Sequence, residues 1–271
     1  MKRGIYLFPS ILTLSNLAAG MVSVLFASNG HYTSASWAIL VGIVMDMMDG
    51  RVARWAGATS QFGLELDSLC DAVTFGVAPA VLMYQVALSS MGRSGAAISI
   101  FFVMAGVLRL ARFNLKAQTG EPSTHFTGLP VPAAAGILAS FVLSYELFGN
   151  DTIPARTIPA VMHRMPTFYR FVPVMMMLLS VLMVSQVQYG NFKQLKLGSP
   201  KSIQTLVVLV GGLLLVFIYP QNMIFVIFCL YVLSGLSRLA VRFYYAQRAK
   251  RMAPQKWGRR STDVGDPGAS H

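Results

Sequence analysis

Apolar runs of about twenty residues recur along the chain, and each is long enough to cross a lipid bilayer as a helix. Hydrophobic residues make up 55% of the sequence and charged residues only 12%, a balance unlike that of soluble domains. Open β-sheets cannot span lipid, because their edge groups would lack hydrogen-bond partners. We therefore predict an all-α, polytopic membrane protein with about eight spans, near residues 11–29, 34–53, 64–89, 95–113, 128–148, 169–187, 204–220 and 222–243.

Basic residues are distributed unevenly between the two sides of this predicted membrane domain. With the N-terminus in the cytoplasm, only Arg93, Arg156, Arg164 and Arg170 of the 22 Lys and Arg residues lie on the outer side. This bias is the one that the positive-inside rule describes. It orients the protein with its N-terminus inside, and it attributes the net charge of +12 to topology and to attraction for anionic membrane lipids. We expect a multi-pass protein of the inner (plasma) membrane. We expect no nucleic-acid partner.

Two regions follow from these patterns. Residues 1–245 are expected to form the integral membrane domain, and residues 246–271 a basic cytoplasmic tail. The tail ends in RRSTDVGDPGASH, a polar stretch with Gly and Pro that is typical of disordered segments.

The stretch DMMDGRVARWAGATSQFGLELDSLCD, residues 46–71, holds five of the ten acidic residues of the chain. Asp46 and Asp49 are spaced by one helical turn, and so are Asp67 and Asp71 after a short connecting turn. Two adjacent antiparallel helices are therefore expected to present two carboxylates each, near the cytoplasmic end of the membrane. Small residues beside them would leave space for a ligand or a helix.

Four carboxylates facing one another within a membrane need cations. Each ionised Asp costs roughly 2.5–3.5 kcal/mol on insertion scales, and Arg54 can offset one charge at most. Oxygen ligands without sulfur or imidazole favour Mg²⁺ or Mn²⁺. Two such ions about 3.5–4 Å apart are suited to clamping phosphate oxygens during an in-line displacement. The alternative interpretation is a set of solvated acids at helix ends.

The spacing of this stretch resembles the signature of the CDP-alcohol phosphatidyltransferase family. The sequence fits D-x2-D-G-x2-A-R-x8-G-x3-D-x3-D without departure, through Asp46, Asp49, Gly50, Ala53, Arg54, Gly63, Asp67 and Asp71. The resemblance implies a six-helix catalytic core, here with about two extra C-terminal membrane helices, and two divalent metal ions. It also implies a reaction in which an alcohol displaces CMP from a CDP-linked lipid.

The same resemblance assigns roles to the matching residues. Asp46, Asp49 and Asp67 correspond to the principal metal ligands. Asp71 corresponds to a further ligand that also accepts the proton of the attacking hydroxyl, which makes it the catalytic residue. The remaining positions are implied to line the CDP-lipid pocket: Gly50, Ala53, Arg54 and Gly63.

Three other segments resemble the bacterial and archaeal phosphatidylserine synthase branch of the family. They are PSILTLSNLAAG at residues 9–20, LRLARFN at residues 108–114 and FTGLPVPAAA at residues 126–135. The first begins with Pro-Ser, where Pro-Asn is common. The branch implies CDP-diacylglycerol and L-serine as substrates, a CDP-diacylglycerol–serine O-phosphatidyltransferase activity and a homodimer.

Polar residues in these segments have two interpretations each. Thr13 and Asn16, one turn apart on the first helix, are able to bind the CDP-lipid or to join helices. Arg109 and Arg112, one turn apart at the cytoplasmic end of the fourth span, are able to bind the serine carboxylate or to anchor the helix. FTGLPVPAAA is expected to serve helix packing.

Two alternative functions remain open from the sequence. The same chemistry could use glycerol 3-phosphate or inositol phosphate, although a phosphate-bearing acceptor would need a larger basic pocket. A cation-coupled transporter would also use intramembrane acids, but its site usually lies near the bilayer midplane on broken helices.

Overall fold

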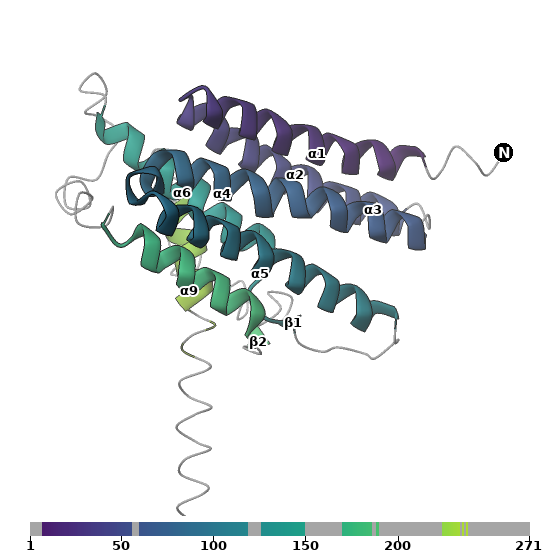
Figure 1. The fold of residues 1–271 in the computed structure, drawn as a ribbon. Helices are drawn as coiled ribbons and strands as arrows, with labels where there is room; N and C mark the ends of the chain where they lie inside the picture. The colour runs from purple at the N-terminus through teal and green to yellow at the C-terminus, as the bar shows by residue number, and fades with distance from the viewer. Residues whose placement is uncertain are drawn as a thin grey trace, which may run out of the picture.

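The computed structural model describes residues 7–55, 60–118, 126–149, 170–185, 188–189, 224–233, 235 and 237. Within these residues the chain is a bundle of helices (Figure 1). The exception is a two-residue antiparallel pair, in which β1 (Phe126–Thr127) bonds to β2 (Gln188–Tyr189). The prediction of an all-α fold is confirmed.

Each of the first six predicted apolar segments contains a described helix. The helices are α1 (Leu7–Ser28), α2 (Tyr32–Trp55), the run from α3 to η3, α5 (Arg93–Gln118), α6 (Val131–Gly149) and α9 (Val172–Val184). A further helix, Ile224–Leu233, falls in the last predicted segment. The segment at 204–220 lies outside the described residues, and so does the tail 246–271.

The third predicted segment is one long helical run with two wide turns. It comprises α3 (Gln61–Asp71), the π-helix η1 (Ala72–Val77), α4 (Ala78–Met83), the π-helix η2 (Tyr84–Leu88) and the short η3 (Ser89–Met91). Ser60 caps its start, since its side chain accepts a hydrogen bond from the backbone of Gly63. Single π-turns inside α-helices are often found at functional sites.

Helix α6 packs against α2, α4, α5, α9 and η1. Helix α1 lies along α2, α2 along α6, and α5 along α9 (Figure 1). The small-residue face of α6 packs as the sequence predicts: Ala134 and Ala135 are fully buried, together with Leu138 and Val142. Small side chains at a helix interface let backbones approach closely, which compensates for the weak hydrophobic driving force in lipid.

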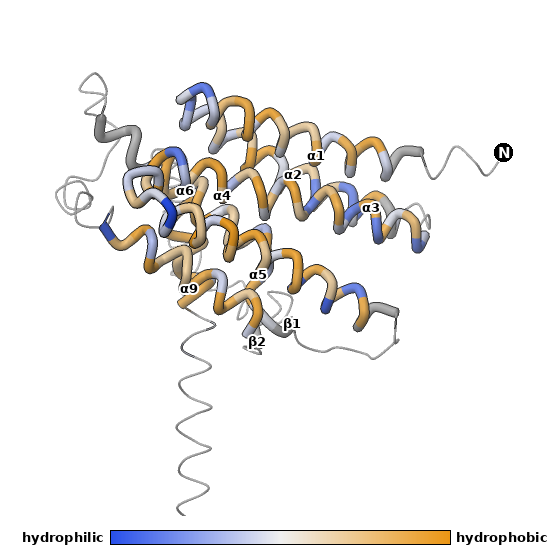
Figure 2. Tube along the Cα trace, in the orientation of Figure 1, coloured by the Kyte–Doolittle hydropathy of each residue, from blue (hydrophilic) through white to orange (hydrophobic). Residues whose placement is uncertain are grey.

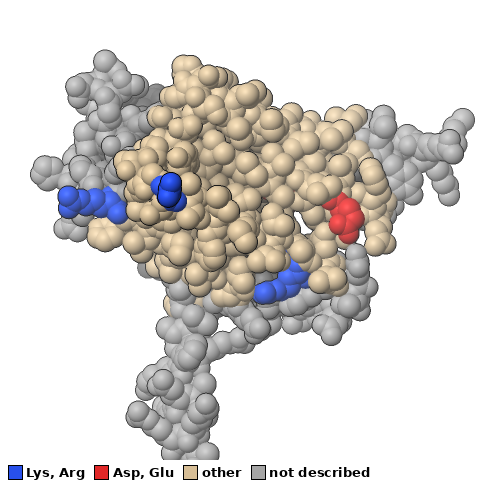
Figure 3. All heavy atoms as spheres, viewed as in Figure 1, with Lys and Arg blue, Asp and Glu red and all other residues tan. Residues whose placement is uncertain are grey.

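The outer surface of the bundle is apolar. Large hydrophobic side chains are exposed on α1, α2, α5 and α9, for example Leu25, Val44, Met104 and Val174. Figure 2 shows hydrophobic residues along these helices, and Figure 3 shows few charged side chains on the described surface of this face. Such a surface would aggregate in water, and it is suited to lipid. The chain is an all-α membrane protein.

Three of the described helices are long and apolar enough to cross a membrane: Ser10–Ser28, Gln61–Met91 and Arg93–Leu115. Shorter apolar helices are Val131–Ser144, Val172–Val184 and Ile224–Leu233. The count of eight spans and the boundary at residue 245 remain predictions.

Close contact between α1 and η1 depends on a glycine. A Cβ added at Gly20 would lie 2.5 Å from the Thr74 hydroxyl oxygen and 2.7 Å from the Thr74 Cα, which is backbone. We expect Gly20→Ala to lower the thermal unfolding midpoint in detergent, because overpacking costs about 1–3 kcal/mol.

Gly76→Ala is the matched control for this prediction. An added Cβ there meets only Val103 Cγ1, at 4.0 Å. Its midpoint should be unchanged or higher, since Ala stabilises helices relative to Gly. An equal loss in both variants would show that the Gly20–Thr74 contact is not the cause.

Candidate active site

Three carboxylates from α2 and α3 converge at one point. Asp46 and Asp49 come from α2 and Asp67 from α3, and one oxygen of each lies within 4.8 Å of the others. The one-turn spacing of Asp46 and Asp49 places both on one face of α2, and their carboxylates meet that of Asp67. The sequence prediction that these residues lie together is confirmed.

The chemistry of these carboxylates fits a divalent cation. Asp49 is 5% exposed, and its Oδ2 is buried without a hydrogen-bond partner among the described residues. Asp67 Oδ1 is likewise buried without a hydrogen-bond partner among the described residues. A buried anion without a partner is costly, and a hard cation with oxygen ligands removes that cost. The donor set is therefore suited to Mg²⁺ or Mn²⁺, with no soft ligand in the group.

Asp71 has different surroundings from the other three aspartates. It is the last residue of α3, is 7% exposed, and does not belong to the converging group. Its Oδ1 accepts a hydrogen bond from Asn16 Nδ2 at 3.0 Å. Of the four predicted carboxylates, three therefore converge, and the fourth, that of Asp71, is hydrogen-bonded to α1.

Two polar residues of α1 contact the aspartates. Thr13 hydrogen-bonds to Asp49, and Asn16 to Asp71. The backbone carbonyl of Asn16 also accepts a hydrogen bond from the Thr74 hydroxyl, at 2.9 Å. These contacts agree with the interpretation that Thr13 and Asn16 join helices. Binding of the CDP-lipid by the same two residues remains a prediction.

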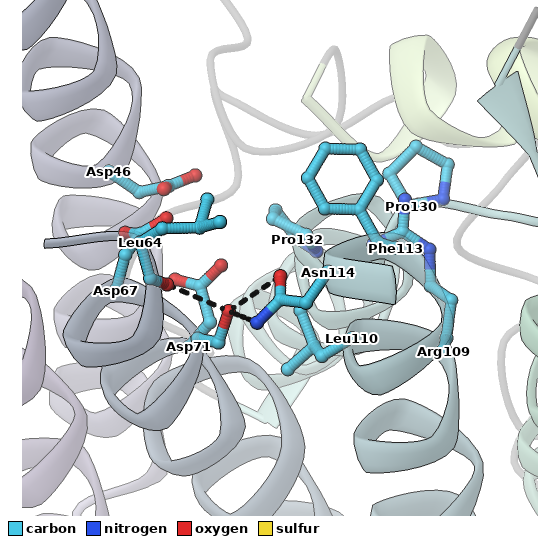
Figure 4. A pocket seen from close by; sticks show the side chains of 11 residues that line it. Asp46, Leu64, Asp67, Asp71, Arg109, Leu110, Phe113, Asn114, Pro130 and Pro132 are labelled. Carbon is cyan, nitrogen blue, oxygen red and sulfur yellow. Dashed lines mark hydrogen bonds between the residues drawn. The ribbon is translucent and has the colours of Figure 1, made fainter. Parts of the chain in front are cut away.

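A pocket of about 210 Å³ opens beside the carboxylates (Figure 4). Asp46, Asp67 and Asp71 lie on one side, and residues of α5 lie on the other. The described lining residues are Asp46, Leu64, Asp67, Ser68, Asp71, Arg109, Leu110, Phe113, Asn114, Pro130 and Pro132. The pocket thus joins an anionic wall, an apolar portion and one cationic side chain.

Asn114 joins α5 to α3 at this pocket. Its Nδ2 donates to Ser68 Oγ at 2.9 Å and to Glu65 Oε2 at 3.2 Å, and Ser68 Oγ donates back to Asn114 Oδ1 at 3.2 Å. Sequence reasoning left Asn114 open and missed Ser68, which lies next to Asp67 on α3. It also treated Pro130 and Pro132 as packing residues, although both line the pocket.

The two arginines of α5 face different surroundings. Arg109 lines the pocket, and its Nε is buried without a hydrogen-bond partner among the described residues. Arg112 is exposed and donates from Nη1 to the carbonyl oxygen of Val184 at 2.8 Å, at the end of α9. Arg112 is not among the lining residues, so the structure favours Arg109 for ligand contact and a helix-joining role for Arg112.

The small residues of the signature are less informative. Gly63 is the third residue of α3, and its N–H is bound by the Ser60 side chain at 3.0 Å. Gly50 is half-buried in α2. The side chains of Ala53 and Arg54 lie outside the described part of the chain. Their predicted contacts with a CDP-lipid remain predictions.

Comparison with known proteins agrees with the site. Residues 6–187 match the CDP-alcohol phosphatidyltransferase family, and the chain belongs to that family. It is 36% identical over 237 residues to the CDP-diacylglycerol–serine O-phosphatidyltransferase of Helicobacter pylori, which covers 86% of this chain and 91% of the relative. The protein of the same name in Bacillus subtilis is 36% identical over 51% of this chain and 76% of its own length. The archaetidylserine synthase of Methanothermobacter thermautotrophicus is 37% identical over 50% of this chain and 58% of its own length.

The carboxylate cluster makes a prediction about metal binding. Asp49→Ala removes a buried ligand, and we expect the Kd for Mn²⁺ to rise at least about tenfold, because even second-shell changes cost 10–100-fold. Titration followed by the electron paramagnetic resonance of free Mn²⁺ measures it. Glu65→Ala, an exposed acid of the same region, is the control. Equal Kd values for Asp49→Ala and the wild type would contradict a role for Asp49 as ligand.

The arginines make a second prediction. Arg109→Ala should raise the KM of a carboxylate-bearing acceptor about tenfold or more, because a charge-assisted hydrogen bond is lost. Arg112→Ala should leave that KM within about twofold and lower the thermal stability instead, since its partner is a backbone carbonyl of α9. A raised KM in Arg112→Ala with an unchanged KM in Arg109→Ala would show that Arg112, and not Arg109, binds the acceptor.

Proposed function

We propose that this chain transfers the phosphatidyl group of CDP-diacylglycerol to the hydroxyl of L-serine, giving phosphatidylserine and CMP. The observation that carries the proposal is the pocket. Asp46, Asp67 and Asp71 line one side of it, and Arg109, the one cationic residue among the described lining, lies on the other side with apolar residues. The serine transferase of Helicobacter pylori, similar over 86% of this chain, supports the choice of reaction.

The aspartates of α2 and α3 would hold the divalent ions. Asp46, Asp49 and Asp67 are the proposed principal ligands of two Mg²⁺ or Mn²⁺ ions, and Asp71 is the proposed further ligand. When bound, such ions neutralise the diphosphate of the CDP-lipid and make CMP a better leaving group. The buried, partnerless oxygens of Asp49 and Asp67 are consistent with this assignment.

Asp71 is the proposed general base. The serine hydroxyl oxygen forms a bond to the phosphorus that carries the diacylglycerol, the bond from that phosphorus to the CMP oxygen breaks, and the hydroxyl proton passes to Asp71. Asn16 donates to Oδ1 of Asp71, which fixes the carboxylate and leaves Oδ2 for the proton. Arg109 would bind the serine carboxylate through two parallel hydrogen bonds.

The CDP-lipid is proposed to lie along the α2–α3 side of the pocket. Gly50, Ala53, Arg54 and Gly63 are the proposed lining residues, and Thr13 and Asn16 act there by holding the aspartates. The apolar lining of Leu110 and Phe113 is suited to the part of the lipid next to the diphosphate.

The charge of the pocket bears on the acceptor. Among the described lining residues Arg109 alone is cationic, whereas an acceptor such as glycerol 3-phosphate or inositol phosphate brings a phosphate dianion. Serine, with one carboxylate, is the better match. No observation in the described part of the chain favours a cation-coupled transporter.

The cellular setting is also part of the proposal. The bias of Lys and Arg supports an inner-membrane location with the N-terminus, the tail and the active site on the cytoplasmic side. We also propose a homodimer, on the basis of the family resemblance, and a membrane domain over residues 1–245, on the basis of the apolar segments.

The test is release of CMP by the purified full-length protein given CDP-diacylglycerol and Mg²⁺. Serine, glycerol 3-phosphate, inositol phosphate or no acceptor are supplied in parallel. Release is expected with serine, and it should be lost with a chelator. Release of CMP with another acceptor but not with serine would overturn serine as the substrate. If folded protein releases no CMP with any of these acceptors, the transferase activity is overturned.

The same assay tests the base. Asp71→Asn removes the proton acceptor but keeps the volume and the partner Asn16, so turnover should fall by about 10²-fold or more. The Kd for CDP-diacylglycerol should stay within about tenfold of the wild-type value, since the three converging carboxylates remain. Normal turnover in this variant would remove Asp71 from the base role.

A further inference from the structure

The side-chain amide of Asn114 lies at the pocket in a defined orientation. Asn114 is 8% exposed, lines the pocket and reaches from α5 toward the aspartates (Figure 4). Its Nδ2 group donates to Glu65 Oε2 at 3.2 Å. Because an ionised carboxylate only accepts hydrogen bonds, this contact identifies the nitrogen end of the amide and thereby the oxygen end.

The contacts among the described residues use both protons of the amide nitrogen but leave capacity on the amide oxygen. Nδ2 of Asn114 donates one proton to Glu65 and the other to Ser68 Oγ, at 2.9 Å. Ser68 Oγ has a single proton, for which the Leu64 carbonyl at 3.1 Å and Asn114 Oδ1 at 3.2 Å compete. An amide oxygen has two lone pairs, so Oδ1 keeps at least one of them for a ligand.

Glu65 makes this oxygen a better acceptor for a cation. A carboxylate that accepts from the amide nitrogen polarises the amide, since hydrogen bonds in series reinforce one another. The negative charge of Glu65 beside the amide also favours a donor that carries positive charge. Asn114 Oδ1 is therefore suited to an ammonium group, whose charge-assisted hydrogen bonds are stronger than those of a neutral donor.

The other side-chain oxygens of the described lining have different uses. They belong to Asp46, Asp67, Asp71 and Ser68. The aspartates are proposed to bind divalent ions or to accept a proton, and an ammonium group beside divalent ions would be repelled. Ser68 Oγ already accepts from Asn114. The amide oxygen of Asn114 is the oxygen that remains for an ammonium group.

We propose that Asn114 Oδ1 binds the ammonium group of the acceptor and makes the site selective for a hydroxy acid that carries an amino group. The inference rests on the proposed function and adds a third contact to it. Arg109 would bind the carboxylate, Asp71 would accept the hydroxyl proton, and Asn114 would accept from the ammonium group. All three residues line one pocket of about 210 Å³.

The first test compares two acceptors on the full-length wild type, by release of CMP from CDP-diacylglycerol in the presence of Mg²⁺. 3-Hydroxypropanoate has the hydroxyl and the carboxylate of serine but no amino group. The kcat/KM for L-serine should exceed that for 3-hydroxypropanoate about tenfold or more, because a hydrogen bond from a charged group is lost. An equal or higher value for 3-hydroxypropanoate would overturn the ammonium contact.

Two variants of the same residue isolate the amide oxygen. Asn114→Leu and Asn114→Asp both lose the Nδ2 group that joins α5 to α3, but only Asn114→Asp keeps an oxygen acceptor in the place of Oδ1. The preference for L-serine over 3-hydroxypropanoate should fall about tenfold or more in Asn114→Leu and stay at or above the wild-type value in Asn114→Asp.

The outcomes of this comparison separate substrate binding from helix joining. An equal fall in both variants would assign the effect to the lost connection between α5 and α3, and an unchanged preference in Asn114→Leu would leave Asn114 no part in selectivity. Either result overturns the proposal. If Asn114→Leu does not fold, a preference below the wild-type value in Asn114→Asp overturns it, and a preference at or above that value supports it.

Ser180→Ala is the control for the loss of a buried polar group. Ser180 is fully buried, and its hydroxyl donates to the Met176 carbonyl within α9, at 2.8 Å. The preference for L-serine should be unchanged in this variant. A fall equal to that of Asn114→Leu would show that the preference follows general destabilisation, and it would overturn the proposal.

Failure of the proposed function would look different. Folded wild type that releases CMP with neither L-serine nor 3-hydroxypropanoate overturns both proposals. Wild type that uses the two acceptors equally well overturns the contact of Asn114 with the ammonium group, while the transfer to serine stands.

Discussion

The convergence of three carboxylates from two helices, of which Asp49 is buried and Asp46 and Asp67 are half-buried, sets the conditions for the rest of this molecule. Negative charges in a medium of low dielectric repel one another and lose their hydration, so the fold needs either cations or polar neighbours around them. The polar residues of α1 answer part of this need, since Thr13 and Asn16 each contact an aspartate of a different helix. Among the carboxylates that the structure describes, Asp49 and Asp67 each keep a buried oxygen without a hydrogen-bond partner, and a bound cation would remove that cost.

The same constraint bears on the polar contacts that α1 makes with α3 and η1. In lipid, helices do not associate by the hydrophobic effect, so close packing and interhelical hydrogen bonds hold them together. Gly20 and Gly42 bring α1 and α2 close to Thr74, and the Thr74 hydroxyl bonds to the backbone of Asn16. Asp71 and its neighbouring helix α1 are therefore held near one another by these close glycine contacts.

Sequence reasoning located the acidic cluster because helical spacing fixes the directions of side chains on one helix. The convergence of Asp46, Asp49 and Asp67 followed from spacing and from one antiparallel turn. Spacing cannot decide which neighbouring helix meets a given face. Arg109 and Arg112 are one turn apart, yet the first meets the pocket and the second meets the end of α9.

The π-helix η1 has a consequence for how patterns along this chain are counted. A π-turn holds one residue more than an α-turn, so the angular phase of the helix shifts within Ala72–Val77. A polar stripe counted from Asp67 through Asp71 does not continue on the same face into α4. Asp71 and Thr74 are three residues apart at the start of this π-helix, and both bind Asn16 of α1, so two successive turns of one helix bind the same residue of another.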